Sequence, residues 1–120
     1  MPEKSAVRSI EREELQAKIE QGDNIVVVEA LPPNYYDEGH LPGALNMPHD
    51  QVDELAARLI PDKDVEVVVY CANLECQNSV AASQRLAELG YSAVREYEGG
   101  KKDWIEGGLP VEKGPARQTV

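Results

Sequence analysis

The stretch "VEVVVYCANLECQNS", residues 65–79, decides the fold. It opens with a short, nearly continuous, valine-rich run, which is typical of a strand covered on both faces in a parallel sheet. A loop follows this run, and a helical pattern begins near Ser79, which we expect to be the N-cap. Cys71 therefore stands at the carboxyl edge of the predicted sheet, where open α/β sheets bind their ligands.

The rest of the chain repeats this alternation of strands and helices. The expected strands cover 6–9, 25–28, 44–46, 65–70 and 93–96. The expected helices cover 11–21, 52–59 and 79–89. Gly22 and Gly90 mark the ends of the first and last of these helices, because glycine readily adopts the left-handed conformation of a helix C-cap. Strands and helices in alternation predict an α/β fold.

Composition and charge limit the domain organisation and the partners. The chain has 120 residues, 42% of them apolar, which fits one domain with its own core. We expect this domain at residues 1–112 and a flexible C-terminal tail at 113–120, where apolar anchors are lacking. The formal net charge of -10 argues against binding to nucleic acid or to an anionic membrane. No signal peptide or membrane-spanning stretch is evident, so we expect a cytoplasmic location.

The two cysteines require a chemical interpretation, because two are too few for a disulfide framework. Loop amides and a helix N-terminus carry partial positive charge, so we expect Cys71 to be an unusually acidic nucleophile. The alternative is a buried cysteine that acts as a small apolar residue. Cys76 is either a loop residue without chemical importance or the partner of Cys71 in a disulfide.

Two other kinds of site are disfavoured. Zinc needs about four ligands at characteristic spacing, and His40 and His49 are far in sequence from the cysteines, so we expect no metal site. A phosphatase or arsenate reductase loop needs an arginine six residues after the cysteine, and Gln77 stands there instead. That substitution argues against chemistry on phosphate esters.

Several segments together resemble a single-domain rhodanese, a member of the sulfurtransferase family. The resemblance covers about residues 7–111, and "GHLPGA" is its most specific motif. The matching segments are "IVVVEA" at 25–30, "YYDEGHLPGALNMP" at 35–48, "VVVYC" at 67–71, "AELGY" at 87–91, "EGG" at 98–100, Trp104 and "GGLPV" at 107–111. In physical terms, "GHLPGA" reads as a tight turn with a structural His40, and Trp104 reads as a core residue.

The resemblance implies about five parallel strands flanked by helices on both faces, with Cys71 as the catalytic cysteine. It also implies that Cys71 takes a sulfane sulfur from a small donor (persulfide, polysulfide or thiosulfate), holds it as a persulfide, and yields it to a thiol acceptor or to a protein. No cofactor is implied. The substrate-binding loop would comprise Ala72, Asn73, Leu74, Glu75, Cys76, Gln77, Asn78 and Ser79.

Three departures from the family pattern affect the expected activity. The loop from Cys71 to Ser79 is about two residues longer than the family's usual loop, with Cys76 near the usual arginine. The family's arginine two positions after an acidic residue is absent at Leu31, so an ion pair with Glu29 is expected to be missing. Glu75 adds a negative charge to the loop, which opposes binding of the thiosulfate dianion. We therefore expect weak thiosulfate activity.

Two alternatives to sulfur transfer stay open. One is a catalytically silent rhodanese module that binds a protein partner through its acidic surface. The other is a thiol redox switch between Cys71 and Cys76, in which Cys76 is the resolving cysteine.

Overall fold

A five-stranded, fully parallel sheet forms the centre of the computed structural model, which describes residues 7–114. The strand order is β1-β5-β4-β2-β3. The strands are β1 (Val7–Ser9), β2 (Ile25–Glu29), β3 (Leu45–Asn46), β4 (Glu66–Tyr70) and β5 (Ala93–Tyr97). The predicted α/β sheet is confirmed, and the two valine-rich runs, now β2 and β4, are neighbours at its centre.

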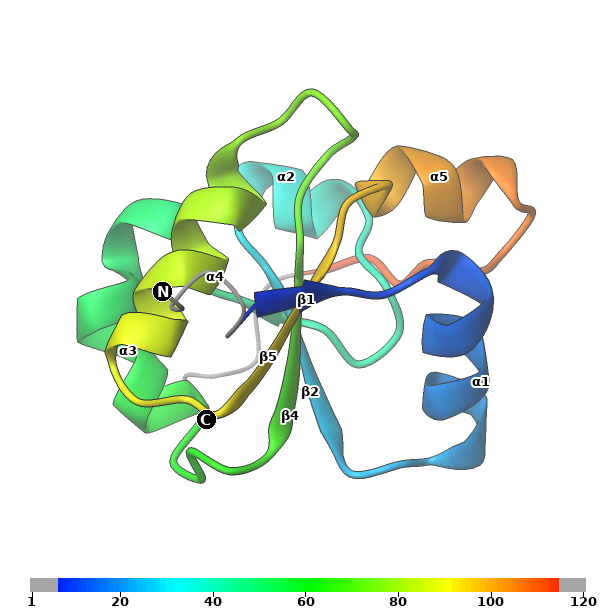
Figure 1. The fold of residues 1–120 in the computed structure, drawn as a ribbon. Coiled ribbons are helices and arrows are strands. Elements are labelled where there is room, and N and C mark those ends of the chain that lie inside the picture. Colours follow the sequence, from blue (N-terminus) through cyan, green and yellow to red (C-terminus); the bar gives the residue numbers. More distant parts are fainter. Residues whose placement is uncertain (1–6, 115–120) are drawn as a thin grey trace.

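Helices cover both faces of this sheet (Figure 1). The helices are α1 (Arg12–Gln21), α2 (Pro33–Glu38), η2 (His49–Gln51), α3 (Val52–Leu59), α4 (Asn78–Glu88) and α5 (Gly100–Glu106). One core cluster joins α3 and α4 to the sheet, and includes Val52 and Leu86. The other cluster joins α1 and α5 to the opposite face, and includes Leu15 and Trp104.

The alternation of side chains along β4 explains why helices pack on both faces of the sheet. Val67 and Val69 of β4 belong to the α3/α4 cluster, whereas Val68 and Tyr70 belong to the α1/α5 cluster. Successive side chains of a strand point to opposite faces, so a valine-rich strand supplies apolar surface to both sides. The central strands therefore need cover on both faces, and the helices provide it.

Most expected boundaries agree with the structure to within one or two residues. The helix at 52–59 is confirmed, and α1 ends at Gly22 in the left-handed conformation, with φ 71°. The expectation that Ser79 is an N-cap is wrong: Gln77 holds that position, and Ser79 lies buried in the first turn of α4. The sequence reading missed α2 and α5. Ala6 of the expected first strand and residues 115–120 of the expected tail lie outside the described residues.

The elements around Cys71 meet at one end of the molecule. The loop between β4 and α4 rises beyond the sheet edge, and α2 and α5 lie at the same end (Figure 1). Backbone hydrogen bonds join the start of α5 to the loop: the Lys101 amide donates to Cys71 O, and the Lys102 amide donates to Ala72 O, both at 2.9 Å. The carboxyl edge of the sheet therefore carries the candidate site, as expected.

Candidate functional site

Cys71 follows the last residue of β4 and is 1% exposed. Polar groups contact its sulfur: Sγ lies 3.5 Å from the backbone oxygen of Cys76 and 3.3 Å from Ser79 Oγ. Ser79 in turn donates its hydroxyl proton to Glu96 Oε2 at 2.7 Å. The alternative of a cysteine that only fills apolar core is therefore not supported, because its sulfur takes part in a hydrogen-bonded chain.

The expected acidity of Cys71 is contradicted. Burial, together with the hydrogen bond to the Cys76 side chain, raises the pKa of Cys71 to about 11, although the amide of Ser79, and its hydroxyl when it donates to the sulfur, oppose this shift. Burial disfavours the charged thiolate because it removes water from the sulfur. In the resting protein Cys71 is thus a neutral thiol at neutral pH.

The loop amides explain why Cys71 is less acidic than expected. The Oδ1 atom of Asn73 accepts the amide protons of Glu75, at 3.0 Å, and of Cys76, at 3.1 Å. The Cys76 amide also lies 3.2 Å from the backbone oxygen of Asn73. An asparagine that binds the amide two residues ahead forms a local turn. These amides are consequently engaged within the loop and do not point at Cys71.

Cys76 is the more acidic of the two thiols. Burial by itself would raise its pKa, but hydrogen bonds from the Cys71 side chain and from the backbone amides of Ala72, Asn78 and Ser79 lower it. A sulfur surrounded by amide donors is stabilised as the anion. The loop and the start of α4 therefore favour negative charge on Cys76, whereas at Cys71 only Ser79 opposes the effect of burial.

An ion pair lies beside the site where none was expected. Glu29, at the end of β2, is fully buried, and its carboxylate accepts bonds from Lys101 Nζ at 3.0 Å and from the Tyr70 hydroxyl at 2.7 Å. Burial nevertheless raises the pKa of Glu29. The expectation of a missing partner for Glu29 is wrong, because Lys101 reaches it from α5 and takes the place of the absent arginine at Leu31.

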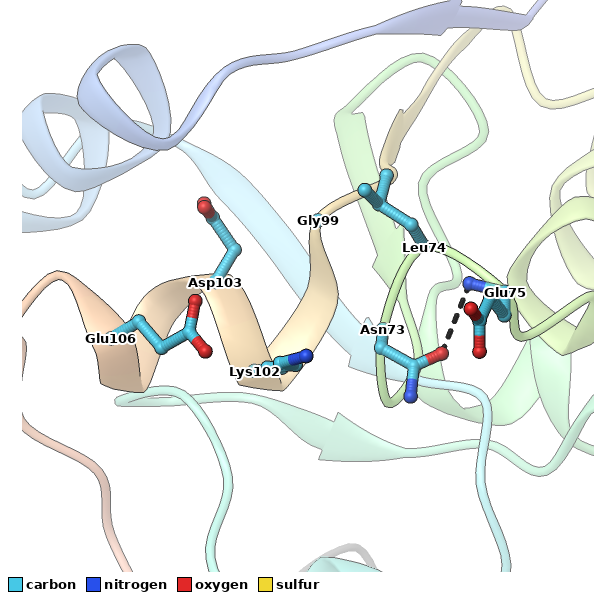
Figure 2. Close-up of a pocket in the computed structure, with 7 residues that line it drawn as sticks. All are labelled: Asn73, Leu74, Glu75, Gly99, Lys102, Asp103 and Glu106. Atoms are coloured by element: carbon cyan, nitrogen blue, oxygen red, sulfur yellow. Dashed lines mark hydrogen bonds between the residues drawn. The ribbon is translucent and has the colours of Figure 1, made fainter.

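A pocket of about 210 Å³ opens between the loop and α5 (Figure 2). Its lining residues are Asn73, Leu74, Glu75, Gly99, Lys102, Asp103 and Glu106. Neither cysteine lines it, so it borders the sulfur site without containing it. Three of its seven lining residues are acidic and one is a lysine. This balance suits a neutral or basic group better than an anion.

Family comparison agrees with this architecture. The profile of the rhodanese-like domain family matches residues 11–106, most of the described chain.

The chain belongs to the rhodanese-like domain family.

Two curated relatives illustrate the range of proteins that contain such a domain. The chain is 33% identical over 106 residues to an HTH-type transcriptional regulator of Mycobacterium tuberculosis, which covers 88% of this chain and 45% of the regulator. It is 38% identical over 76 residues to a thiosulfate sulfurtransferase of Escherichia coli, which covers 63% of this chain and 70% of that protein. The chain thus spans less than half the length of the regulator.

Solved structures show the same rhodanese-like fold. A thiosulfate sulfurtransferase from Pseudomonas aeruginosa superposes with a TM-score of 0.83 and 26% identity, over 95% of this chain and 22% of that one. A protein from Bacillus halodurans gives the same TM-score and identity over 92% of this chain and 80% of that one. The five-stranded parallel architecture is therefore shared with these proteins.

The other residues singled out from the sequence of this rhodanese-like domain differ in solvent exposure and in their contacts. Leu74, Glu75 and Gln77 are exposed, whereas Ala72 and Asn78 are half-buried. His40 is buried, stacks on Tyr36, and lies 2.8 Å from its backbone oxygen through Nδ1, which fits the expected structural role. Trp104 is a core residue, as expected, and its indole donates to Pro110 O. Within residues 7–114, no group of three or more His, Cys, Asp or Glu side chains could hold a metal ion.

Sequence reasoning missed the roles of Lys101 and Glu96. Glu96 shares its strand face with Val94, which belongs to the α3/α4 cluster, so period-2 parity places it under α4 rather than in solvent. That parity was the available signal for Glu96. Lys101 gave no such signal, because its contact with Glu29 joins segments 72 residues apart.

Proposed function

We propose that the chain is a sulfurtransferase, or persulfide carrier, that moves a sulfane sulfur through a persulfide on Cys71 to a thiol acceptor. One observation carries the proposal: the Cys71 sulfur lies directly after β4, at the carboxyl edge of the sheet, in contact with polar groups of the loop and α4. The names of the Escherichia coli and Pseudomonas aeruginosa proteins support the same reaction class.

The reaction has two nucleophilic steps. In the first, the Cys71 sulfur attacks the outer sulfur of a donor R–S–SH, the donor S–S bond breaks, and RSH leaves with the proton that Cys71 gives up. In the second, the thiolate of the acceptor attacks the outer sulfur of the Cys71 persulfide, and Cys71 leaves and regains a proton. Sulfur is passed on without net oxidation of the protein.

The charge around the site favours persulfide or polysulfide donors over thiosulfate. Glu75 is exposed on the loop and lines the adjacent pocket with Asp103 and Glu106. Carboxylates within a Debye length repel a dianion, whereas a donor of low charge avoids this cost. A protein acceptor also fits, because Leu74 at the loop tip is 73% exposed and offers apolar contact surface.

Intact-mass analysis tests the proposed function. The protein is reduced, mixed with polysulfide or with thiosulfate, and measured beside Cys71→Ala and the matched control Cys76→Ser. We expect one added sulfur atom on the parent and on Cys76→Ser, and a clearly lower yield on Cys71→Ala, in which Cys76 can still react but is not the proposed carrier. An adduct of equal yield on Cys71→Ala, or no adduct on any form, would refute sulfur transfer through Cys71.

A second candidate is a redox role for Cys76, which its lowered pKa favours. The Cys76 thiolate would attack the inner sulfur of the Cys71 persulfide, form a Cys71–Cys76 disulfide and expel hydrosulfide. A thiol reductant would then restore both thiols. In that case the parent should release sulfide and lose two hydrogens in mass, while Cys76→Ser should keep a stable persulfide. Equal persulfide lifetimes in the two forms would exclude this resolving role.

The neutral state of Cys71 gives the catalytically silent module its main support. A protein-binding domain would need no thiolate, and the exposed Leu74 would serve as its contact residue. Under this hypothesis, no donor adds sulfur at any pH at which the protein stays folded. Detection of the Cys71 adduct described above would eliminate it.

A further inference from the structure

A chain of two hydrogen bonds leads from Cys71 to a carboxylate on β5. Cys71 Sγ donates to Ser79 Oγ at 3.3 Å, and Ser79 Oγ donates to Glu96 Oε2 at 2.7 Å. Ser79 is 2% exposed, in the first turn of α4, and Glu96 is half-buried on the strand below it. The three residues come from three different elements, so the tertiary fold alone brings them together.

The number of protons that Ser79 can donate determines how it affects the protonation of the Cys71 sulfur. A serine hydroxyl has one proton to donate. While Glu96 is ionised, that proton is held in a charge-assisted bond to the carboxylate, which is stronger than a bond to a neutral acceptor. Ser79 can then only accept a proton from Cys71, so the lowering of the Cys71 pKa that a donating hydroxyl would give is lost and the thiol is favoured over the thiolate.

Ionisation of Cys71 would reverse the first bond of the chain and break the second. A thiolate accepts hydrogen bonds, so the Ser79 hydroxyl would have to turn toward the sulfur. The half-buried carboxylate of Glu96 would then lose its donor, which is costly for a partly desolvated charge. Negative charge on Cys71 and negative charge on Glu96 therefore compete for one hydroxyl proton.

We propose that Glu96 is a positioning residue that acts through Ser79 to hold Cys71 as a neutral thiol while its own carboxylate is ionised. Neutralising Glu96 frees the Ser79 hydroxyl for the sulfur and favours the thiolate. The inference deepens the proposed function, since it concerns the nucleophile of that reaction, but it describes a protonation equilibrium that is measurable without any sulfur donor.

The surroundings of Glu96 set the pH range of this effect. Burial raises the pKa of Glu96, the Ser79 bond opposes the rise, and the charge of Glu98 adds to it. Its register partners on the flanking strands are Ser9 and Val69, which carry no charge. A raised pKa brings protonation of Glu96 nearer to neutral pH. Mild acidification should therefore free the Ser79 hydroxyl and lower the pKa of Cys71.

Thiolate titration by ultraviolet absorbance tests the proposal. All variants carry Cys76→Ser, so that Cys71 is the only thiol; its contact with the backbone oxygen of residue 76 does not depend on that side chain. The pKa of Cys71 is measured in this parent, in Glu96→Gln, in Ser79→Ala and in the double variant. Glu98→Gln is the matched control, because it removes a nearby charge that does not bond to Ser79.

Glu96→Gln should lower the pKa of Cys71 by about one pH unit, because the glutamine amide can donate to Ser79 Oγ and free the hydroxyl for the sulfur. The same substitution should have less than half this effect when residue 79 is alanine, and Glu98→Gln should have a small effect. An unchanged or raised pKa in Glu96→Gln would overturn the proposal. An equal shift in both backgrounds would also overturn it, because a charge effect through space does not need Ser79.

Persulfide loading gives a second readout, and it is measured for Glu96→Gln in the same Cys76→Ser background, so that sulfur added to Cys76 does not contribute. At neutral pH we expect loading to be about threefold faster than in the parent, because a tenfold gain in thiolate is offset by the lower nucleophilicity of a more acidic thiol. The loading rate of Glu96→Gln should also fall more steeply on acidification than the rate of the parent. In the parent, protonation of Glu96 lowers the pKa of Cys71 as the pH falls, and this cannot occur in the variant. A slower rate in Glu96→Gln would contradict the inference. Absence of loading in the parent would instead refute the proposed function and leave the titration as the deciding test.

Discussion

The two cysteines differ most clearly at the level of single residues. The position of Cys71 between a predicted strand and a predicted helix indicated an acidic nucleophile, but burial raises its pKa, and the lowered pKa belongs to Cys76. Burial raises the pKa of Cys71, whereas hydrogen bonds from the Cys71 side chain and from three backbone amides lower the pKa of Cys76. Sequence cannot reveal this division, because it depends on where Asn73 directs its side-chain oxygen.

Alkylation should therefore modify Cys76 before Cys71. At neutral pH, iodoacetamide reacts with the thiolate, and the lowered pKa of Cys76 gives it the larger thiolate fraction. Cleavage after Glu75 separates the two cysteines, so the label on each is measured by mass spectrometry of the fragments. We expect at least a tenfold faster reaction at Cys76, a ratio equal to about one pH unit of pKa difference. Faster labelling of Cys71 would show that the loop amides act on the other sulfur.

The buried Glu29–Lys101 pair predicts a pH-dependent stability. Lys101→Met leaves Glu29 charged, buried and without its cation, which should cost about 3 kcal/mol of unfolding free energy at neutral pH. The folded pKa of Glu29 is already raised, so this carboxyl favours the folded state when protonated and loses that contribution as pH rises through its folded pKa. The destabilisation should therefore shrink on acidification toward the ordinary glutamate pKa. Urea unfolding at several pH values measures it.

Lys102→Met is the matched control for this experiment. Lys102 is exposed on the same helix and lines the pocket instead of contacting Glu29. Its replacement should change stability by less than about 0.5 kcal/mol, as is usual for a surface site. A similar loss in both variants would show that the Glu29 contact is not the cause.

At the level of elements, apolar periodicity in the sequence predicted the long, regular helices and strands but missed the short helices. The helix at 52–59 and the valine-rich strands follow directly from apolar spacing, because each buries a regular face. The helices α2 and α5 have six and seven residues, too few for a clear period. Pro33 at the start of α2 was the available signal, because proline is favoured in the first turn of a helix.

The contact between α5 and the loop predicts a strong effect at Gly100. Its φ is 68°, and a Cβ built there would lie 2.5 Å from the backbone oxygen of Cys71. Gly100→Ala should cost at least about 2 kcal/mol, because backbone strain and a steric clash with the main chain add together. It should also slow persulfide loading, since relief of the clash displaces the residue that bears the sulfur.

Gly22→Ala isolates the strain from the clash. Gly22 has a similar φ of 71°, but a Cβ there would meet nothing within 4 Å. Thermal or urea unfolding should therefore show a smaller loss of about 1 kcal/mol, with loading at the parent rate. Equal losses at the two glycines would mean that α5 yields to the extra methyl group and does not fix the loop.

At the scale of the whole molecule, fold and net charge act on the site in opposite ways. The parallel sheet and its two helical layers place Cys71 at the edge where ligands of such sheets bind, which the strand order could predict. The chain has a net charge of -10, and three of its carboxylates, on Glu75, Asp103 and Glu106, line the pocket at this edge. In the described residues, no helix is long and apolar enough to span a membrane. The fold thus defines the place of the proposed reaction, and we expect the charge to favour donors of low charge.

Thiosulfate should accordingly be a poor donor whose reaction improves with salt. Repulsion between a dianion and an acidic surface weakens as ionic strength rises, because the Debye length falls from about 10 Å at 0.1 M to about 3 Å at 1 M. Loading rates measured from 0.05 to 1 M salt, about the range that spans this change, should rise several-fold for thiosulfate and stay level for an uncharged persulfide donor. Glu75→Gln should raise the thiosulfate rate at low salt and flatten its salt dependence, because it removes the carboxylate on the loop itself. A thiosulfate rate that falls with added salt would mean that a cation, and Lys102 first of all, governs the approach of the donor.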